Sequence, residues 1–105
     1  MTAARRFAPE GTRFGVQLAH SGRKGSAARP WEGGKPLRTD QDPWATVAPS
    51  AIPFTEGWAT PEALDEAGIE RVIAALVQAA ERAARIGFDV VEPHAGHGYL
   101  LHQFL

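Results

Sequence analysis

The 105-residue chain contains no cysteine. Disulfides, a thiol nucleophile and cysteine-based metal sites are therefore excluded. The chain also has no apolar stretch of about 18 residues, which a membrane-spanning helix requires. Its first residues are polar and do not form the apolar segment of a signal peptide. We therefore expect a cytoplasmic protein without a membrane partner.

An excess of charge of one sign is also lacking, since 11 basic and 12 acidic residues give a formal net charge of −1. The N-terminal half is more basic and the second half more acidic, but no run of aromatic and basic residues suggests a nucleic-acid groove. We expect no nucleic-acid partner. The composition, with 44% hydrophobic and 22% charged residues, fits a piece of a soluble globular protein.

Two segments have the pattern of strands. At 14–19, large apolar residues alternate with smaller or polar ones, which predicts a strand on which Gln17 faces away from the apolar side. A second strand is predicted at 88–94, where the two-residue period places Glu92 on the same face as His94. Glu92 could then orient His94 or set its protonation.

A helix is predicted before the second strand, from about Glu66 to Ile86. Apolar residues recur there at helical spacing, Asp65 is a good N-cap, and Gly87 suits a left-handed C-terminal cap. We expect the apolar stripe to face the core, and we expect residues 60–62 to start a separate short turn before the helix. A helix that leads into a strand is typical of an α/β fold.

Most of the glycines and prolines lie at 21–58, which predicts a long irregular loop. Loops of this length are usually functional or disordered. The loop contains Trp31, Trp44 and Trp58. They could shield a pocket, but large aromatic side chains more often anchor a loop onto the body of a domain, and we favour that role. Residues 1–11 are predicted to be the tail of a helix or a disordered start.

The last twelve residues place two histidines and a tyrosine immediately after the second strand. Because α/β barrels keep their chemistry at the carboxyl ends of their strands, His94, His97 and Tyr99 form a candidate set for holding an oxyanion and delivering a proton. Two other interpretations fit the spacing. The histidines could bind zinc, with Glu92 and His102 as further ligands, or they could only hydrogen-bond loop carbonyls.

Four segments carry further motifs in a fixed order. They are FGVQLAHSGRK at 14–24, PWEGG at 30–34, APSAIPF at 48–54, and GFDVVEPH at 87–94, which leads into HAGHGYLLHQFL. Together they resemble the QLAHAGRK segment, the loop element that follows it, and the APSAI and GFDVVEIHAAHGYLLHQFL segments of the old yellow enzyme family of flavin-dependent ene-reductases. The likeness is greatest to the bacterial branch with paired substrate-binding histidines. Each motif alone is modest, but their order and spacing make the resemblance specific.

The resemblance implies a role for each matching residue. Gln17 matches the glutamine that hydrogen-bonds the pyrimidine side of FMN. His94 and His97 match the pair that holds the carbonyl oxygen of an α,β-unsaturated substrate, and Tyr99 matches the residue that protonates its α-carbon. The implied parent enzyme, an NADPH dehydrogenase, passes hydride from NADPH or NADH through FMN to the β-carbon of an activated alkene, without a metal. Without the resemblance, Gln17 is better explained as a polar residue bonded to a neighbouring strand.

Two positions depart from the family pattern. Pro93 stands where the family usually has a branched aliphatic residue, and a proline within a central strand removes one ladder donor, which would disturb the placement of His94. Gly96 replaces the usual alanine and loosens the backbone between the two histidines. Neither change removes a functional group.

The length of the chain limits what it can form. A complete (β/α)8 barrel needs about 250 residues. We therefore expect residues 1–105 to be a fragment of one FMN-binding TIM barrel domain, with about two strands, a long loop and one long helix, or roughly a third of the family's length. Open strand edges and a partly covered helix favour self-association or partial unfolding. The chain is then an ene-reductase segment or a truncated remnant that does no chemistry; a small metal-binding module is a weaker third hypothesis.

Overall fold

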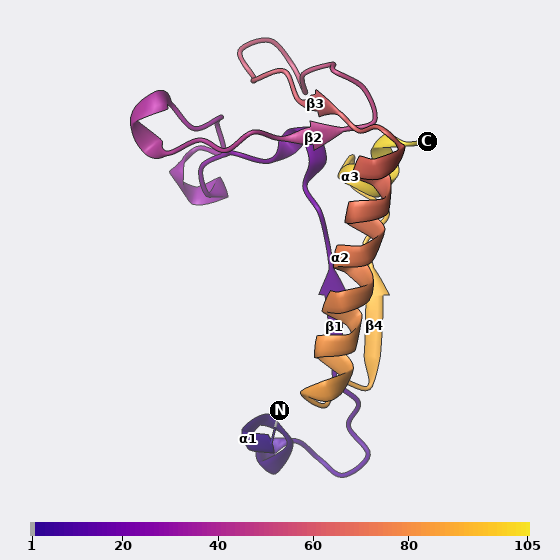
Figure 1. The fold of residues 1–105 in the computed structure, drawn as a ribbon. Helices are drawn as coiled ribbons and strands as arrows, with labels where there is room; N and C mark the ends of the chain where they lie inside the picture. The colour runs from indigo at the N-terminus through magenta and orange to yellow at the C-terminus, as the bar shows by residue number, and fades with distance from the viewer. Residues whose placement is uncertain (1) are drawn as a thin grey trace.

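The computed structural model describes residues 2–105 as a parallel strand pair, a long helix beside it, and loops gathered at one end of the pair (Figure 1). The helices and strands are α1 (Thr2–Phe7), β1 (Gly15–Leu18), β2 (Val47–Ala48), β3 (Glu62–Ala63), α2 (Glu66–Arg85), β4 (Val90–Pro93) and α3 (Leu100–Gln103). Among these described residues, no helix combines the length and the apolar character needed to cross a membrane.

β1 and β4 pair in parallel, with Gln17 opposite Glu92 and Leu18 opposite Pro93. The proline does not interrupt this pairing, because the next amide, His94 N–H, still donates to Leu18 O at 2.8 Å. Backbone amides point alternately to the two sides of a strand. The missing donor of Pro93 therefore lies on the outer edge of β4, and the expected disturbance of His94 is not found.

The long helix begins and ends where its sequence predicts. Asp65 is extended and its Oδ1 accepts a hydrogen bond from Gly68 N at 2.7 Å, as an N-cap does. The helix ends at Arg85, one residue before the predicted Ile86. Gly87 then takes a φ of 98°, the left-handed conformation expected of it. Local signals at both ends therefore determine the length of α2.

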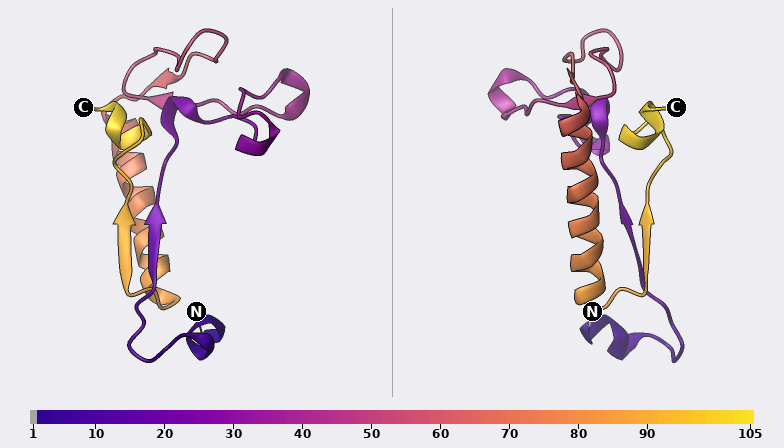
Figure 2. Two further views of the ribbon diagram at one scale, coloured as in Figure 1. Left: turned by 180° about the vertical axis from the view of Figure 1, so that it is seen from behind. Right: turned by 45° about the vertical axis from the view of Figure 1, so that its right-hand side comes forward.

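α2 lies along one face of the strand pair and contacts both β1 and β4 (Figure 2). Its predicted apolar stripe is only partly covered: Val72 and Leu76 are half-buried, but Ile73 is 55% exposed and Val77 is 52% exposed. Ala83 and Gly68 are the buried residues of the helix. The stripe therefore faces the core with one flank and solvent with the other.

The glycine-rich segment 21–58 is mostly irregular, as predicted, but it contains three single 3-10 turns and the short strand β2. β2 pairs in parallel with β3, where we expected a turn at 60–62. Glu62 N–H donates to Thr46 O at 2.8 Å. The backbone at 60–62 is therefore held by a hydrogen bond to a segment distant in sequence, and not by a local turn. The pair lies beyond the carboxyl ends of β1 and β4 (Figure 1).

The expected anchoring by tryptophans is wrong for two of the three. Trp31 is 80% exposed and Trp44 is 56% exposed. Trp58 is half-buried and packs edge-on against Phe54, with ring centroids 5.1 Å apart. Exposure of this kind depends on which surfaces meet in three dimensions, which residue type alone does not specify.

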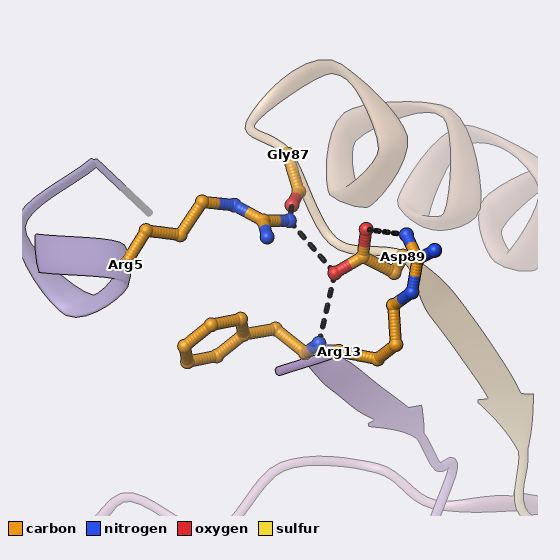
Figure 3. A network of polar contacts seen from close by, with 5 residues as sticks. Arg5, Arg13, Gly87 and Asp89 are labelled. Carbon is orange, nitrogen blue, oxygen red and sulfur yellow. Dashed lines mark hydrogen bonds and ion pairs between the residues drawn. The ribbon is translucent and has the colours of Figure 1, made fainter. Parts of the chain in front are cut away.

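The opposite end of the strand pair is held by Asp89 (Figure 3). α1 confirms the predicted helix at the N-terminus. It brings Arg5 to Asp89 Oδ2 at 2.7 Å. The same carboxylate accepts from Phe14 N–H at 2.9 Å, and Arg13 approaches its other oxygen at 3.5 Å. The hydrogen bond from Phe14 N–H, followed by the bond from Arg5, lowers the pKa of Asp89 below its ordinary value.

Asp89→Asn should flatten the acid limb of the stability curve. Because the pKa of Asp89 is lowered on folding, its ionised form stabilises the fold above pH about 4, and this stabilisation is lost as the pH falls through the folded-state pKa. The urea midpoint of the wild type, followed by circular dichroism, should therefore decline below pH about 4 more steeply than that of the variant.

Asp42→Asn is the matched control. Asp42 makes no ion pair with any of residues 2–105, and asparagine tolerates its left-handed φ of 52°. This variant should keep the acid limb of the wild type. An equally steep acid limb in Asp89→Asn would show that the Asp89 contacts do not stabilise the fold.

Candidate functional site

The candidate site lies at the carboxyl ends of β1 and β4, where the chain turns from β4 into α3 (Figure 1). The turn is sharp because His97 and Gly98 both take left-handed conformations, with φ values of 55° and 70°. Left-handed backbone is uncommon for a residue other than glycine. The turn therefore places the His97 side chain back over the end of β4.

His94 and His97 contact each other directly. His94 Nε2 and His97 Nδ1 are 3.1 Å apart, and the two rings stack with centroids 5.0 Å apart and 30° between their planes. Since one nitrogen must donate and the other accept, this hydrogen bond occupies one nitrogen of each ring. Two neutral imidazoles carry two N–H groups in all, and the mutual bond uses one of them, so an oxygen that accepts from both neutral rings requires this bond to break.

Tyr99 completes the predicted set. Its ring centroid lies 5.6 Å from that of His94, at an angle of 57°, and its side chain is half-buried. The structure thus brings His94, His97 and Tyr99 together as the sequence predicts. Their roles in binding and proton delivery stay predictions.

Lys24 belongs to the same cluster, although sequence reasoning assigned it no role. Its Nζ donates to His97 O at 2.8 Å and lies 5.5 Å from the Tyr99 ring centroid. Nζ is also 4.8 Å from the Phe54 ring centroid. The lysine stood at the end of the first family-like motif, but no spacing rule connects it with His97, which is 73 residues further along the chain.

Gln103 is a second residue that sequence reasoning missed. Its Nε2 donates to Gly98 O at 2.8 Å and to Ser21 O at 3.3 Å, and its Oε1 accepts from Arg23 N–H at 3.3 Å. One side chain therefore ties the turn after β4 to the turn after β1. A glutamine on a short helix gives no sequence signal of this role.

His20 adds a third connection between the two strand ends. Its backbone oxygen accepts from Leu100 N–H at 2.9 Å, and its Nδ1 accepts from Gly22 N–H at 3.0 Å. Burial lowers the pKa of His20 below its ordinary value. The neutral imidazole therefore persists at neutral pH, which keeps Nδ1 available as an acceptor.

Gln17 and Glu92 face each other across the strand pair. Gln17 Nε2 donates to Glu92 Oε1 at 2.8 Å, so Glu92 is held by Gln17, and within residues 2–105 it makes no hydrogen bond with His94, which it could have oriented. A hydrogen bond from Gln17 to the neighbouring strand is what we expect of this residue when the family resemblance is set aside. Gln17 is nevertheless exposed, and its Oε1 accepts no hydrogen bond from residues 2–105.

The arrangement of Gln17 suits the ring of FMN. A carboxamide offers both donor and acceptor, and the pyrimidine edge of a flavin carries both as well. The side chain is on the strand face opposite the half-buried Val16 and Leu18, close to the strand ends. The residues present therefore fit the ring end of FMN, and no residue of this chain is assigned to its phosphate.

The proposed metal ligands do not converge. His102 Nδ1 accepts from Gly98 N–H at 2.8 Å, and Glu92 is bonded to Gln17. Within residues 2–105, no group of three histidine, aspartate or glutamate side chains is arranged to hold a metal ion. His94 and His97 thus lie together, but His102 and Glu92, the further ligands that the zinc hypothesis needs, are bonded to other groups.

An open groove of about 700 Å³ begins beside Tyr99. Its walls include Ala19 just after β1, Lys24, and the packed pair of Phe54 and Trp58. The volume is in the range of small-molecule sites. The groove therefore provides space for a ligand next to the predicted catalytic set.

Gly98→Ala should lower the free energy of unfolding by about 1–2 kcal/mol, because the left-handed conformation is costly for an L-residue with a Cβ. The added Cβ would also lie 2.8 Å from Lys24 Nζ and push it from His97 O. Urea unfolding measures the stability, and the His97 resonances in NMR spectra report the displaced turn.

Gly96→Ala is the matched control two residues earlier. Its Cβ would meet His94 Cε1 at 3.5 Å, an ordinary contact, and Gly96 has no positive φ. Stability should stay the same or rise by up to about 1 kcal/mol. Equal losses in the two variants would contradict the role given to the left-handed turn.

Comparison with known proteins identifies the family to which the chain is similar. The sequence model of the family described as NADH:flavin oxidoreductase / NADH oxidase matches residues 6–105. The NADPH dehydrogenase of Listeria monocytogenes serotype 4a is 48% identical over 95 residues, which are 90% of this chain and 24% of that protein. The NADPH dehydrogenase of Geobacillus thermodenitrificans is 42% identical over the same shares. The chain therefore spans about a quarter of the length of these curated relatives.

Solved structures give the same assignment. Morphinone reductase superposes with a TM-score of 0.67 at 35% identity, over 91% of this chain and 27% of that chain. Histamine dehydrogenase from Rhizobium sp. 4-9 superposes with a TM-score of 0.67 at 30% identity, over 95% and 14%. The expected partial TIM barrel is confirmed. The chain belongs to the NADH:flavin oxidoreductase / NADH oxidase family, a family of FMN-dependent NAD(P)H oxidoreductases.

Proposed function

We propose that this chain is the substrate-binding segment of an FMN-dependent enzyme that reduces α,β-unsaturated carbonyl compounds with NADPH or NADH. The observation that carries the proposal is the cluster of His94, His97 and Tyr99 after the carboxyl end of β4. The exposed Gln17 lies on the neighbouring strand β1, opposite Glu92. The proposed donors for an oxygen, the proton source and the flavin-ring contact then all belong to the paired strands β1 and β4 or to the turn after β4.

The histidines bind and polarise the substrate. Negative charge grows on the carbonyl oxygen when hydride reaches the β-carbon, so fixed N–H donors stabilise the transition state more than the ground state. His94 and His97 supply these donors once a substrate oxygen replaces their mutual hydrogen bond. Bound FMN would supply the hydride chemistry itself.

Tyr99 delivers the proton. A phenol can donate a proton to the α-carbon as charge returns from the oxygen, and Tyr99 borders the groove in which the alkene would lie. Its contact with the His94 ring fixes the distance between the oxygen-binding and the proton-delivering groups. Gln17 orients the flavin ring through its carboxamide, and Glu92 holds Gln17 in place.

The open edges of the strand pair favour assembly. Within the described residues, β1 pairs only with β4 and β4 only with β1, so each strand has one edge without a ladder partner. Unpaired edges template further strands. We propose that the isolated chain associates with copies of itself through these edges, and sedimentation of the purified chain over a range of concentrations measures it.

Gln17→Ala should weaken FMN binding two- to tenfold, because one hydrogen bond to the ring contributes about 0.5–1.5 kcal/mol. Quenching of flavin fluorescence during titration measures the dissociation constant, and circular dichroism confirms the fold. Gln78→Ala, on an exposed part of α2, is the control and should bind like the wild type. Absence of saturable FMN binding by the wild-type chain would favour the non-catalytic remnant.

Tyr99→Phe should slow alkene reduction about a hundredfold and leave FMN binding unchanged, because general acid catalysis typically contributes at least this factor. The measurement is anaerobic re-oxidation of photoreduced FMN on the chain by 2-cyclohexenone, followed by absorbance. An unchanged rate would remove Tyr99 from the mechanism. A loss of FMN affinity in the same variant would assign Tyr99 to flavin binding instead.

A further inference from the structure

We propose that the groove between Tyr99 and the Phe54–Trp58 pair is a subsite for an aromatic ring that carries a carboxylate, and that Lys24 binds this carboxylate. The inference rests on the proposed function, because it concerns the part of the substrate beyond the reacting carbonyl group. It names a substrate class: planar aromatic enones with a separate anionic group.

Lys24 has no carboxylate partner among the described residues, which is the first argument. It shares this with most basic residues of the chain, but Lys24 is the unpaired lysine that lines this groove. The ammonium has three donors and gives one to His97 O. The other two make no hydrogen bond within residues 2–105 and lie near aromatic rings, so an anionic acceptor could form charge-assisted hydrogen bonds with them.

The shape and lining of the groove are the second argument. The lining is mainly apolar, with Phe54, Trp58 and small residues, and it has few polar side chains besides Lys24 and Tyr99. Sites of this kind bind apolar ligands and use a few polar groups to fix their orientation. Aromatic walls favour a flat ring, which can pack edge-on or offset against them.

The position of Lys24 is the third argument. Its Nζ lies 4.8 Å from the Phe54 ring centroid and 5.5 Å from that of Tyr99, while its bond to His97 O connects it to the turn that carries the histidine. A carboxylate at Lys24 is thus close to the reacting group but has its own counter-charge. It would not compete with the carbonyl oxygen for His94 and His97.

The test uses two ligands of nearly equal shape: 4-(3-oxobut-1-enyl)benzoate and the corresponding benzamide. The full chain, labelled with 15N, is titrated with each, and the indole signal of Trp58, assigned with Trp58→Phe, gives the dissociation constants. We expect the benzoate to bind about fivefold more tightly, the upper range of a partly exposed ion pair. Equal affinities in the wild type would overturn the proposal without any variant.

The Lys24 variants then locate the preference. Lys24→Gln keeps a donor for His97 O and removes the charge, so the benzoate should lose its advantage while the benzamide binds as before. Lys24→Arg should keep the advantage. Lys35→Gln, which removes the other lysine of the chain and lies outside this groove, should also keep it. A preference that survives Lys24→Gln, or disappears in Lys35→Gln, would overturn the proposal.

Two further arms separate this inference from its alternatives. If Lys24→Gln does not fold, the salt dependence of the wild type decides: added NaCl should weaken benzoate binding and leave benzamide binding unchanged, and equal salt effects would overturn the proposal. Adenosine 2′,5′-bisphosphate tests whether the lysine instead reads the phosphate of the reductant; Lys24-dependent binding of this compound alone would overturn it. The FMN titration is independent: its failure with a retained benzoate preference would refute the flavin function and leave the anionic subsite standing.

Discussion

The parallel ladder between β1 and β4 is the interaction on which the site depends. It places Gln17 opposite Glu92, although the two residues are 75 positions apart in the chain. The ladder ends where His94 N–H meets Leu18 O, and His94, His97 and Tyr99 lie at or beyond that point, whereas Gln17 and Glu92 lie one step before it. Each half of the site comes from one strand, so neither half alone contains the geometry.

The turns after the two strands extend this pairing into the site. Gln103, His20 and Lys24 connect them by hydrogen bonds between side chain and backbone or between backbones. These bonds mostly use neutral donors and acceptors, whereas the other end of the strand pair is held by the charged contacts of Asp89. The turns that carry the site are therefore held mainly by hydrogen bonds between neutral groups, and the opposite end of the strand pair is held by ion pairs.

Sequence reasoning predicted the elements whose signals are local. Asp65 and Gly87 bound α2 because a cap depends only on its own few residues, and the alternation around Gln17 places β1 within one residue at each end. The motif at the end of the chain brought His94, His97 and Tyr99 together correctly, because all three follow one strand end.

Contacts between distant segments could not be predicted in this way. β3 forms because Glu62 meets Thr46, and Lys24 enters the site because its turn faces His97; neither pattern is written in the surrounding residues. The mutual hydrogen bond of the histidines also had no sequence signal, since spacing gives proximity and not ring orientation. The exposure of Trp31 depends on surfaces that only the folded chain defines.

Pro93 gives the two open edges of the strand pair different properties. On the outer edge of β4 its ring replaces one N–H, so a strand that lies alongside finds no donor next to His94. The outer edge of β1 consists of Gly15–Leu18 and contains no proline. The outer edge of β1 is thus the better edge for pairing with a strand of another copy. Association of copies would then extend the sheet from β1, and the outer edge of β4, next to the histidines, would remain unpaired.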